Sequence, residues 1–155
     1  MAGSYNFHKD LARAEDTEKF VVDLLAKHFG KSFISAEWGG ASKFHDIKLI
    51  CTFLSVHIEL KEDFGCAKYG NIAIEVESRG KPSGLTTSRS KFWLIMAHLK
   101  EGGRKLLSIR AQKLREMIDE KKYVRYTDGG DRRTSKLYLF KLEVIEDAAH
   151  LIWEE

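Results

Sequence analysis

Two acids and a lysine in the first half of the chain have the residue types and spacing of a metal-dependent hydrolytic site. Asp46 begins a run rich in β-branched and aromatic residues, and Glu59-Leu60-Lys61 ends it, thirteen residues after Asp46. Successive side chains of a strand point to opposite faces, so Glu59 and Lys61 share one face while Leu60 points into the core. Two carboxylates can hold a divalent metal, and an ammonium beside them can act on a water molecule. A solvated strand face is the competing interpretation of a Glu-x-Lys pair.

A third acid, Glu18, lies on the apolar stripe of an amphipathic helix predicted over residues 9–29. Val21, Val22 and Leu25 recur near it at helical spacing. A carboxylate among apolar neighbours is unfavourable unless a cation or a hydrogen-bond donor meets it. Glu18 is therefore a candidate metal-side acid, and a glutamate at the edge of the stripe that reaches water is the alternative.

Positive charge is concentrated in the second half of the chain. Residues 79–141 carry 17 Lys and Arg against 6 Asp and Glu, a net charge of +11. Residues 1–78 carry 9 against 12, a net charge of −3, and residues 142–155 carry none against 5, a net charge of −5. A block this basic is a candidate phosphate-binding surface, with an ordinary solvated surface as the alternative.

Two expected loops supply the groups that could hold phosphates. Gly, Pro and Ser punctuate residues 78–88, and glycine lets backbone N–H groups approach an anion. This stretch lacks the Gly-Lys-Ser/Thr ending of a nucleotide-binding P-loop, so we reject that interpretation. Residues 128–133 form the second, charged loop. The candidate DNA-binding residues in and next to these loops are Arg79, Lys81, Ser83, Thr87, Ser88, Arg89, Arg132 and Arg133.

Histidine and cysteine do not indicate a site of their own. The six histidines show no His-Glu-x-x-His or paired spacing, so a zinc site is not expected. His45 and His57 lie close to the acids, and we interpret both as hydrogen-bonded strand residues, with a second catalytic base as the alternative. Cys51 and Cys66 lack metal-type spacing and are expected to be reduced thiols.

Composition favours a single soluble globular domain over residues 1–155. A chain of 155 residues with 43% hydrophobic and 32% charged residues can bury a real core. It has neither the apolar region of a signal peptide nor an apolar run near the roughly 20 residues of a membrane helix. We therefore expect a cytoplasmic protein without a membrane partner.

Periodicity predicts the elements that position these residues. The helix over 9–29 comes first, and a second helix is predicted over 110–121, whose basic face could follow a DNA backbone or be solvated. On the strand over 71–77 we expect Glu75 and Glu77 to be solvated, with extra site acids as the alternative. The remaining strands are predicted over 32–38, 47–54, 56–61, 92–98, 106–109, 123–126 and 136–145, with a turn near Ser55, a loop over 65–70 and an acidic tail after 145.

The combined pattern resembles the PD-(D/E)xK nucleases, and among them a group of small phage-type endonucleases. Asp46 and Glu59-Leu60-Lys61 match the motif, with His45 where the family usually has Pro. Glu-x-x-Val from Glu18, Gly-Asn-x-x-Ile-Glu, Gly-Lys-Pro-Ser-Gly-Leu-x-Thr-Ser and Trp93 extend the similarity over roughly residues 15–95. Many relatives carry Ala-Asp-Tyr before that tryptophan, whereas this chain has Ser-Lys-Phe.

The resemblance implies a restriction-endonuclease-like α/β fold, a mixed central β-sheet flanked by helices with an αβββαβ core and additions. It implies a Mg²⁺-dependent DNA endonuclease, in which Mn²⁺ can substitute. Asp46, Glu59 and the Leu60 carbonyl would be metal ligands, Glu18 would join directly or through water, and Lys61 would orient the attacking water or offset negative charge.

Several functions stay open within that family. A site-specific homing or restriction-type enzyme, a branched-DNA (Holliday junction) resolvase and an RNA-directed nuclease share the same chemistry. A nuclease-like fold that only binds nucleic acid is the alternative outside enzymes. Because cutting both strands of a duplex usually calls for symmetric subunits, we expect a homodimer or a higher homo-oligomer, in the host cell cytoplasm if the protein is phage-encoded.

Overall fold

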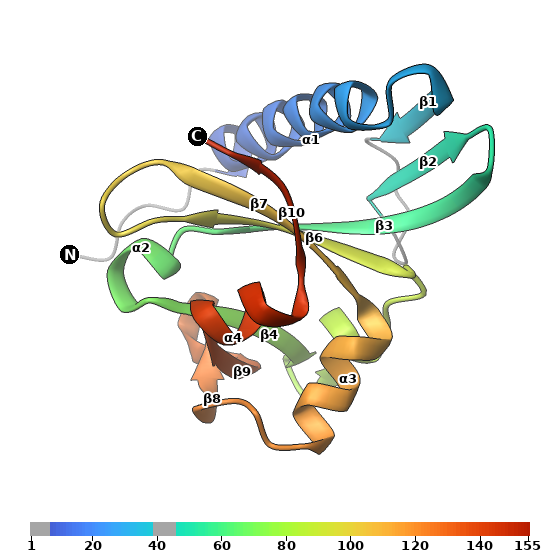
Figure 1. Ribbon diagram of the computed structural model, residues 1–155. Coiled ribbons are helices and arrows are strands. Elements are labelled where there is room, and N and C mark those ends of the chain that lie inside the picture. Colours follow the sequence, from blue (N-terminus) through green and yellow to red (C-terminus); the bar gives the residue numbers. More distant parts are fainter. Residues whose placement is uncertain (1–6, 39–45) are drawn as a thin grey trace.

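A six-stranded mixed sheet runs through the middle of the protein, and a four-stranded antiparallel sheet lies beneath it (Figure 1). The computed structural model describes residues 7–38 and 46–155. The larger sheet has the order β1 (Phe33–Trp38), β2 (Ile47–Cys51), β3 (Leu54–Asp63), β6 (Phe92–His98), β7 (Arg104–Arg110) and β10 (His150–Glu154). The smaller has the order β5 (Lys81–Pro82), β4 (Asn71–Ser78), β9 (Ser135–Lys141) and β8 (Arg125–Gly129).

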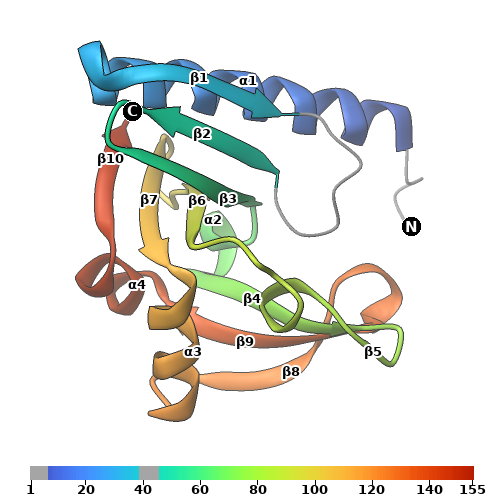
Figure 2. The ribbon, with the colours of Figure 1, turned by 90° about the vertical axis from the view of Figure 1, so that its right-hand side faces the viewer.

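Helices cover both faces of the larger sheet. The long α1 (Phe7–Phe29) lies on one face, and α3 (Ala111–Asp119) and α4 (Leu142–Ala148) lie on the other with the smaller sheet (Figures 1 and 2). The short α2 (Cys66–Tyr69) connects β3 to β4. Three 3₁₀ turns complete the described chain: η1 (Gly30–Ser32), η2 (Gly84–Thr86) and η3 (Asp131–Arg133). No helix in residues 7–38 or 46–155 combines the length and the apolar character needed to cross a membrane.

Two apolar cores follow from this layering. The predicted stripe of α1 is buried, and Val21, Val22 and Leu25 pack on the upper face of the sheet. Their partners there include Ile58 of β3. The lower core includes Ile95 of β6 together with side chains from β4, β9, α3 and α4. Strand β3 therefore has one face toward α1 and the opposite face toward the second sheet.

The sheet is mixed because of a single parallel pairing among the described strands. Strand β3 runs parallel to β6, from the pair Ile58–Phe92 to the pair Asp63–Ala97. All other described strand pairs are antiparallel. The predicted α/β class is confirmed, whereas the sequence pattern gave no sign that the strands would divide between two sheets.

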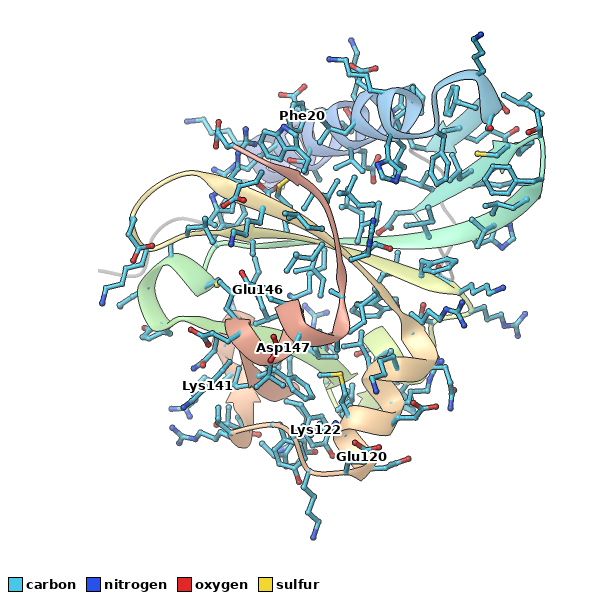
Figure 3. The ribbon with its side chains drawn as sticks, viewed as in Figure 1. Phe20, Glu120, Lys122, Lys141, Glu146 and Asp147 are labelled. Atoms are coloured by element: carbon cyan, nitrogen blue, oxygen red, sulfur yellow. The ribbon has the colours of Figure 1, made fainter. Side chains whose placement is uncertain are left out.

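The prediction was wrong at the C-terminal end. The expected last strand over 136–145 stops at Lys141, and α4 follows, because Ile145 is fully buried in the lower core from a helical position. The expected acidic tail contains β10, which pairs with β7. Trp153 of β10 contacts the ring of Phe20 edge-on, with the ring centroids 5.2 Å apart, and Figure 3 shows Phe20 on α1 near the end of this strand.

Smaller corrections concern turns and loops. The turn between β2 and β3 falls at Thr52–Phe53 rather than near Ser55. Strand β8 spans 125–129 instead of 123–126, and β7 is longer than the predicted 106–109. The expected loop over 65–70 contains α2, whose first turn is held by a hydrogen bond from the Cys66 N–H to Asp63 Oδ1 (3.0 Å). Cys51 and Cys66 are free thiols, as predicted, and both are buried.

Candidate active site

Asp46 and Glu59 meet where β2 joins the sheet beside β3. The antiparallel register of β2 and β3 ends at the pair Ile47–Ile58, so Asp46 and Glu59 are the residues that directly adjoin this last pair. The Asp46 N–H donates to the Ile58 carbonyl (3.0 Å), and Asp46 Oδ2 accepts from the Leu60 N–H (2.8 Å). The side chain of Asp46 is therefore tied to the backbone of the Glu-Leu-Lys segment itself.

Glu18 of α1 lies within electrostatic range of Asp46. Its side chain is half-buried, and its Oε2 atom is buried without a hydrogen-bond partner among the described residues. An unsatisfied carboxylate oxygen in a protein interior is costly, so a hydrogen-bond donor or a cation at this atom would be stabilising. A carboxylate oxygen that needs a cation or a donor is what the position of Glu18 on the apolar stripe led us to expect.

Electrostatics link the three carboxylates. Burial, and then the negative charge of Asp46, raise the pKa of Glu59 from 4.5 to about 7. Burial first, then Asp46 and Glu15, raise the pKa of Glu18 as well. Because Asp46 acts on both glutamates, acids from α1, from the segment before β2 and from β3 belong to one electrostatic cluster. We call Glu18, Asp46 and Glu59 the acid cluster.

The three side chains of the acid cluster are not close enough together to coordinate one metal ion in this arrangement. In the two stretches 7–38 and 46–155, no three His, Cys, Asp or Glu side chains are grouped closely enough to hold one metal ion. One Asp46 oxygen is occupied by the Leu60 N–H. Carboxylate oxygens are nevertheless the donors that Mg²⁺ prefers, and the partnerless Glu18 Oε2 together with the raised pKa of Glu59 fits a cluster that a cation would stabilise.

Lys61 lies on the same face of β3 as Glu59, as the strand alternation predicted. The β3–β6 register sets Glu59 beside Trp93 and Lys61 beside Ile95, two residues of the lower core. The Lys61 ammonium lies 3.8 Å from Asp63 Oδ2. The Asp63 side chain is only 6% exposed. It continues the alternation of Glu59 and Lys61 along β3, but the sequence analysis gave it no role in the site. Its other bonds, to the N–H groups of Cys66 and Ala73, show that it is part of the fold.

The expected phosphate-binding loop is firmly attached to the protein. Glu75 accepts hydrogen bonds from the hydroxyls of Ser83 and Ser135, each at 2.7 Å. Gly84 has φ +52°, and a Cβ at that position would lie 2.2 Å from the Glu75 carbonyl oxygen. Arg115 of α3 donates to two loop carbonyls, both at 3.1 Å. Glu75 is therefore a structural anchor, and our prediction that it is solvated was wrong.

The eight candidate DNA-binding residues divide into two groups. The Ser83 hydroxyl is engaged by Glu75, and Ser88 is buried, with its Oγ accepting from the Trp93 Nε1–H at 3.3 Å. Their hydroxyls are thus used inside the protein. The residues of the set with exposed side chains are Arg79, Lys81, Thr87, Arg89, Arg132 and Arg133.

Three of the exposed arginines are gathered at one end of the smaller sheet. The Arg79 N–H donates to the Thr134 carbonyl (2.9 Å), which places the β4–β5 turn next to the segment between β8 and β9 (Figure 2). Arg79, Arg132 and Arg133 have φ of +52°, +52° and +55°. A left-handed backbone is unusual for a residue other than glycine, and here it occurs at basic positions of one surface. We call these three residues the arginine tip.

The two histidines near the acids are placed differently by the structure. His57 is exposed on β3, and its interpretation as a hydrogen-bonded residue stays a prediction. His45 lies outside the described residues. Glu77 is half-buried on β4 and lines a cavity of about 570 Å³ behind the loop, away from the acid cluster.

Comparison with known proteins does not assign the chain to a family. No protein-family model matches it, and no curated protein or solved structure matches it significantly. The resemblance to PD-(D/E)xK nucleases therefore stays a prediction from the residues, and the site geometry carries the functional argument.

Proposed function

We propose that this protein is a Mg²⁺-dependent DNA endonuclease of the PD-(D/E)xK type, with Mn²⁺ as a possible substitute. One observation carries the proposal: the negative charge of Asp46 raises the pKa of both Glu18 and Glu59, so acids from three separate segments interact electrostatically. Mutual repulsion of buried carboxylates is unfavourable in isolation and favourable around a divalent cation.

The order of elements supports the same assignment. The series α1, β1, β2, β3, α2 and β6 follows the αβββαβ order, with β3 and β6 parallel and with β4, β5 and η2 inserted between α2 and β6. Asp46 directly precedes β2, and Glu59 and Lys61 lie on β3.

Each residue of the site has a role in this proposal. Asp46, Glu59 and the Leu60 carbonyl would bind the metal ion, and Glu18 would join directly or through water. The ion would neutralise phosphate charge and supply an activated water. Lys61 would orient that water or offset the charge that builds on the phosphate in the transition state. Its ion pair with Asp63 holds the ammonium on the Glu59 face of β3.

The basic surface would hold the substrate. The exposed side chains that would contact phosphates are those of Arg79, Lys81, Arg89, Arg132 and Arg133, and the anchored loop would present its backbone to them. Because phosphate contacts release counterions, we expect DNA affinity to fall steeply with salt concentration. A homodimer or a larger homo-oligomer would bring two sites to one duplex.

A cleavage assay tests the proposal. Supercoiled plasmid, linear duplex, a four-way junction and RNA are incubated with protein in Mg²⁺, in Mn²⁺ and in EDTA, beside an Asp46→Asn variant and a Glu77→Gln control. We expect metal-dependent DNA cleavage that Asp46→Asn loses and Glu77→Gln keeps. The preferred substrate separates a duplex endonuclease from a junction resolvase or an RNA-directed enzyme. Binding without cleavage in either metal would replace the proposal with a nucleic-acid-binding module.

A further inference from the structure

A polar network on the other face of β3 begins and ends on α1. Thr17 Oγ1 donates to Glu62 Oε2 (2.7 Å), and Glu62 Oε1 lies 2.9 Å from His98 Nε2 of β6. The His98 ring stacks on Phe64 with the centroids 4.4 Å apart, and Arg13 lies 5.1 Å above the Phe64 ring. Arg13 and Thr17 are one helical turn apart, so the network attaches α1 to the end of β3 at two successive turns.

The hydrogen bond at the centre of this network is well shielded. Thr17 is 9% exposed and the Glu62 side chain 15% exposed. A carboxylate this buried is unfavourable unless its oxygens are paired, and both Glu62 oxygens have partners. The bond joins residues 45 positions apart in the chain, so it fixes a tertiary contact rather than a local turn.

Glu18 lies beside this contact on α1. It directly follows Thr17 in α1, and its Oε2 atom lacks a hydrogen-bond partner among the residues that the structure describes. Glu62 belongs to the strand that carries Glu59, three residues away. The Thr17–Glu62 bond therefore sets where the helix brings Glu18 relative to the strand that holds the rest of the acid cluster.

We propose that Thr17 and Glu62 are positioning residues for the metal site, acting through Glu18. This inference rests on the proposed function, since it assigns the bond a role in metal binding. Hydrogen bonds that orient metal ligands typically change metal affinity or activity by about 10- to 100-fold when they are lost. The Thr17–Glu62 bond acts one step further away, through the helix backbone, so we expect an effect at the lower end, about 10-fold.

The test compares Thr17→Val, which keeps the shape but loses the donor, with Thr17→Ser, which keeps the hydroxyl. Thr127→Val is the matched control, because that hydroxyl bonds only to the neighbouring Asp128 carbonyl on β8. Mn²⁺ binding is measured by titration calorimetry on the DNA-free protein, and cleavage is measured as kcat and KM. We expect Thr17→Val to bind Mn²⁺ about 10-fold more weakly and to lose kcat with KM for DNA unchanged, while Thr17→Ser and Thr127→Val stay within about twofold of the wild type.

A second variant covers the case in which Thr17→Val does not fold. The double variant Thr17→Val with Glu62→Leu leaves no carboxylate unpaired, so it should be better tolerated, and the same loss of Mn²⁺ affinity is expected. Wild-type Mn²⁺ affinity in a folded valine variant, or an equal defect in Thr17→Ser, overturns the inference. If the wild type itself neither binds Mn²⁺ nor cuts DNA, the proposed function fails first, and the two failures are thereby distinguished.

Discussion

Replacing Glu59 by Gln should stabilise the metal-free protein at neutral and alkaline pH. In the folded chain, burial and the charge of Asp46 raise the pKa of Glu59 from 4.5 to about 7. A carboxyl with a raised pKa in the folded state contributes stability that is fully present below the unfolded pKa. That contribution is lost as pH rises through the folded value, because the ionised form is unfavourable in the fold.

The size of the effect follows from that pKa. A difference of this size corresponds to about 3 kcal/mol of unfolding free energy for a fully shielded group. Part of the Glu59 side chain remains in solvent, and screening reduces the effect, so we expect about 1–2 kcal/mol. The variant should therefore gain about 1–2 kcal/mol relative to the wild type between about pH 5 and about pH 8.

Urea denaturation in EDTA at those two pH values measures the difference directly. Glu77→Gln on β4 is the control, since it removes a half-buried strand carboxylate outside the acid cluster. Added Mg²⁺ should stabilise the wild type at the higher pH. It should stabilise Glu59→Gln less, because the variant has a neutral amide in place of the carboxylate ligand. A stability difference between wild type and Glu59→Gln that is the same at both pH values would refute the reasoning.

Three further predictions concern other parts of the molecule. Lys61→Ala should abolish cleavage while unfolding free energy changes by less than about 1 kcal/mol, the usual range for a partly exposed ion pair; cleavage at the wild-type rate would remove Lys61 from the site. Replacing Arg132 and Arg133 together by Gln should reduce the slope of log affinity against log salt by about 2, measured by fluorescence anisotropy on duplex DNA; an unchanged slope would exclude both from phosphate contact. Gly84→Ala should destabilise the fold by at least about 2 kcal/mol in urea denaturation, because its backbone is left-handed and a Cβ would collide with the Glu75 carbonyl; a neutral effect would show that the loop can move away from β4.

The sequence pattern was informative where local chemistry and strand alternation agree. The alternation placed Glu59 and Lys61 on one face of β3 and Leu60 on the other, and the β3–β6 register bears out that arrangement. The sequence pattern identified Glu18 as a carboxylate on an apolar stripe, and in the described part of the chain its buried Oε2 atom has no hydrogen-bond partner. Such signals can be read from the sequence alone, because a charged residue occupies a position that the helical period assigns to the apolar core.

Tertiary contacts explain what the pattern did not predict. Glu75 looked like a solvated strand residue, since no local feature indicates that Ser83 and Ser135 would donate to it from two other segments. The run after Lys141 contains β-branched residues that favour a strand, but burial of Ile145 in the lower core selects a helix. Tertiary packing overrides propensity in short segments of this kind.

The division into two sheets was hidden for a related reason. Strands β4 and β9 are separated by 56 residues of chain between Ser78 and Ser135, and their pairing is antiparallel and non-local. Alternation identifies each strand and its faces but carries no information about which distant strand completes the ladder. The face of β3 that carries Glu59 and Lys61 was therefore easier to predict than the pairing of distant strands.

The anchoring of the loop between β4 and β6 has a consequence for the kinetics of recognition. Ser83, Gly84, Leu85 and Ser88 are already fixed by hydrogen bonds or close packing before any ligand arrives. A preformed backbone of this kind loses less conformational entropy on association than a flexible loop does. Encounter with a polyanion should then be limited by diffusion and ionic strength, without a slow step in which the loop closes.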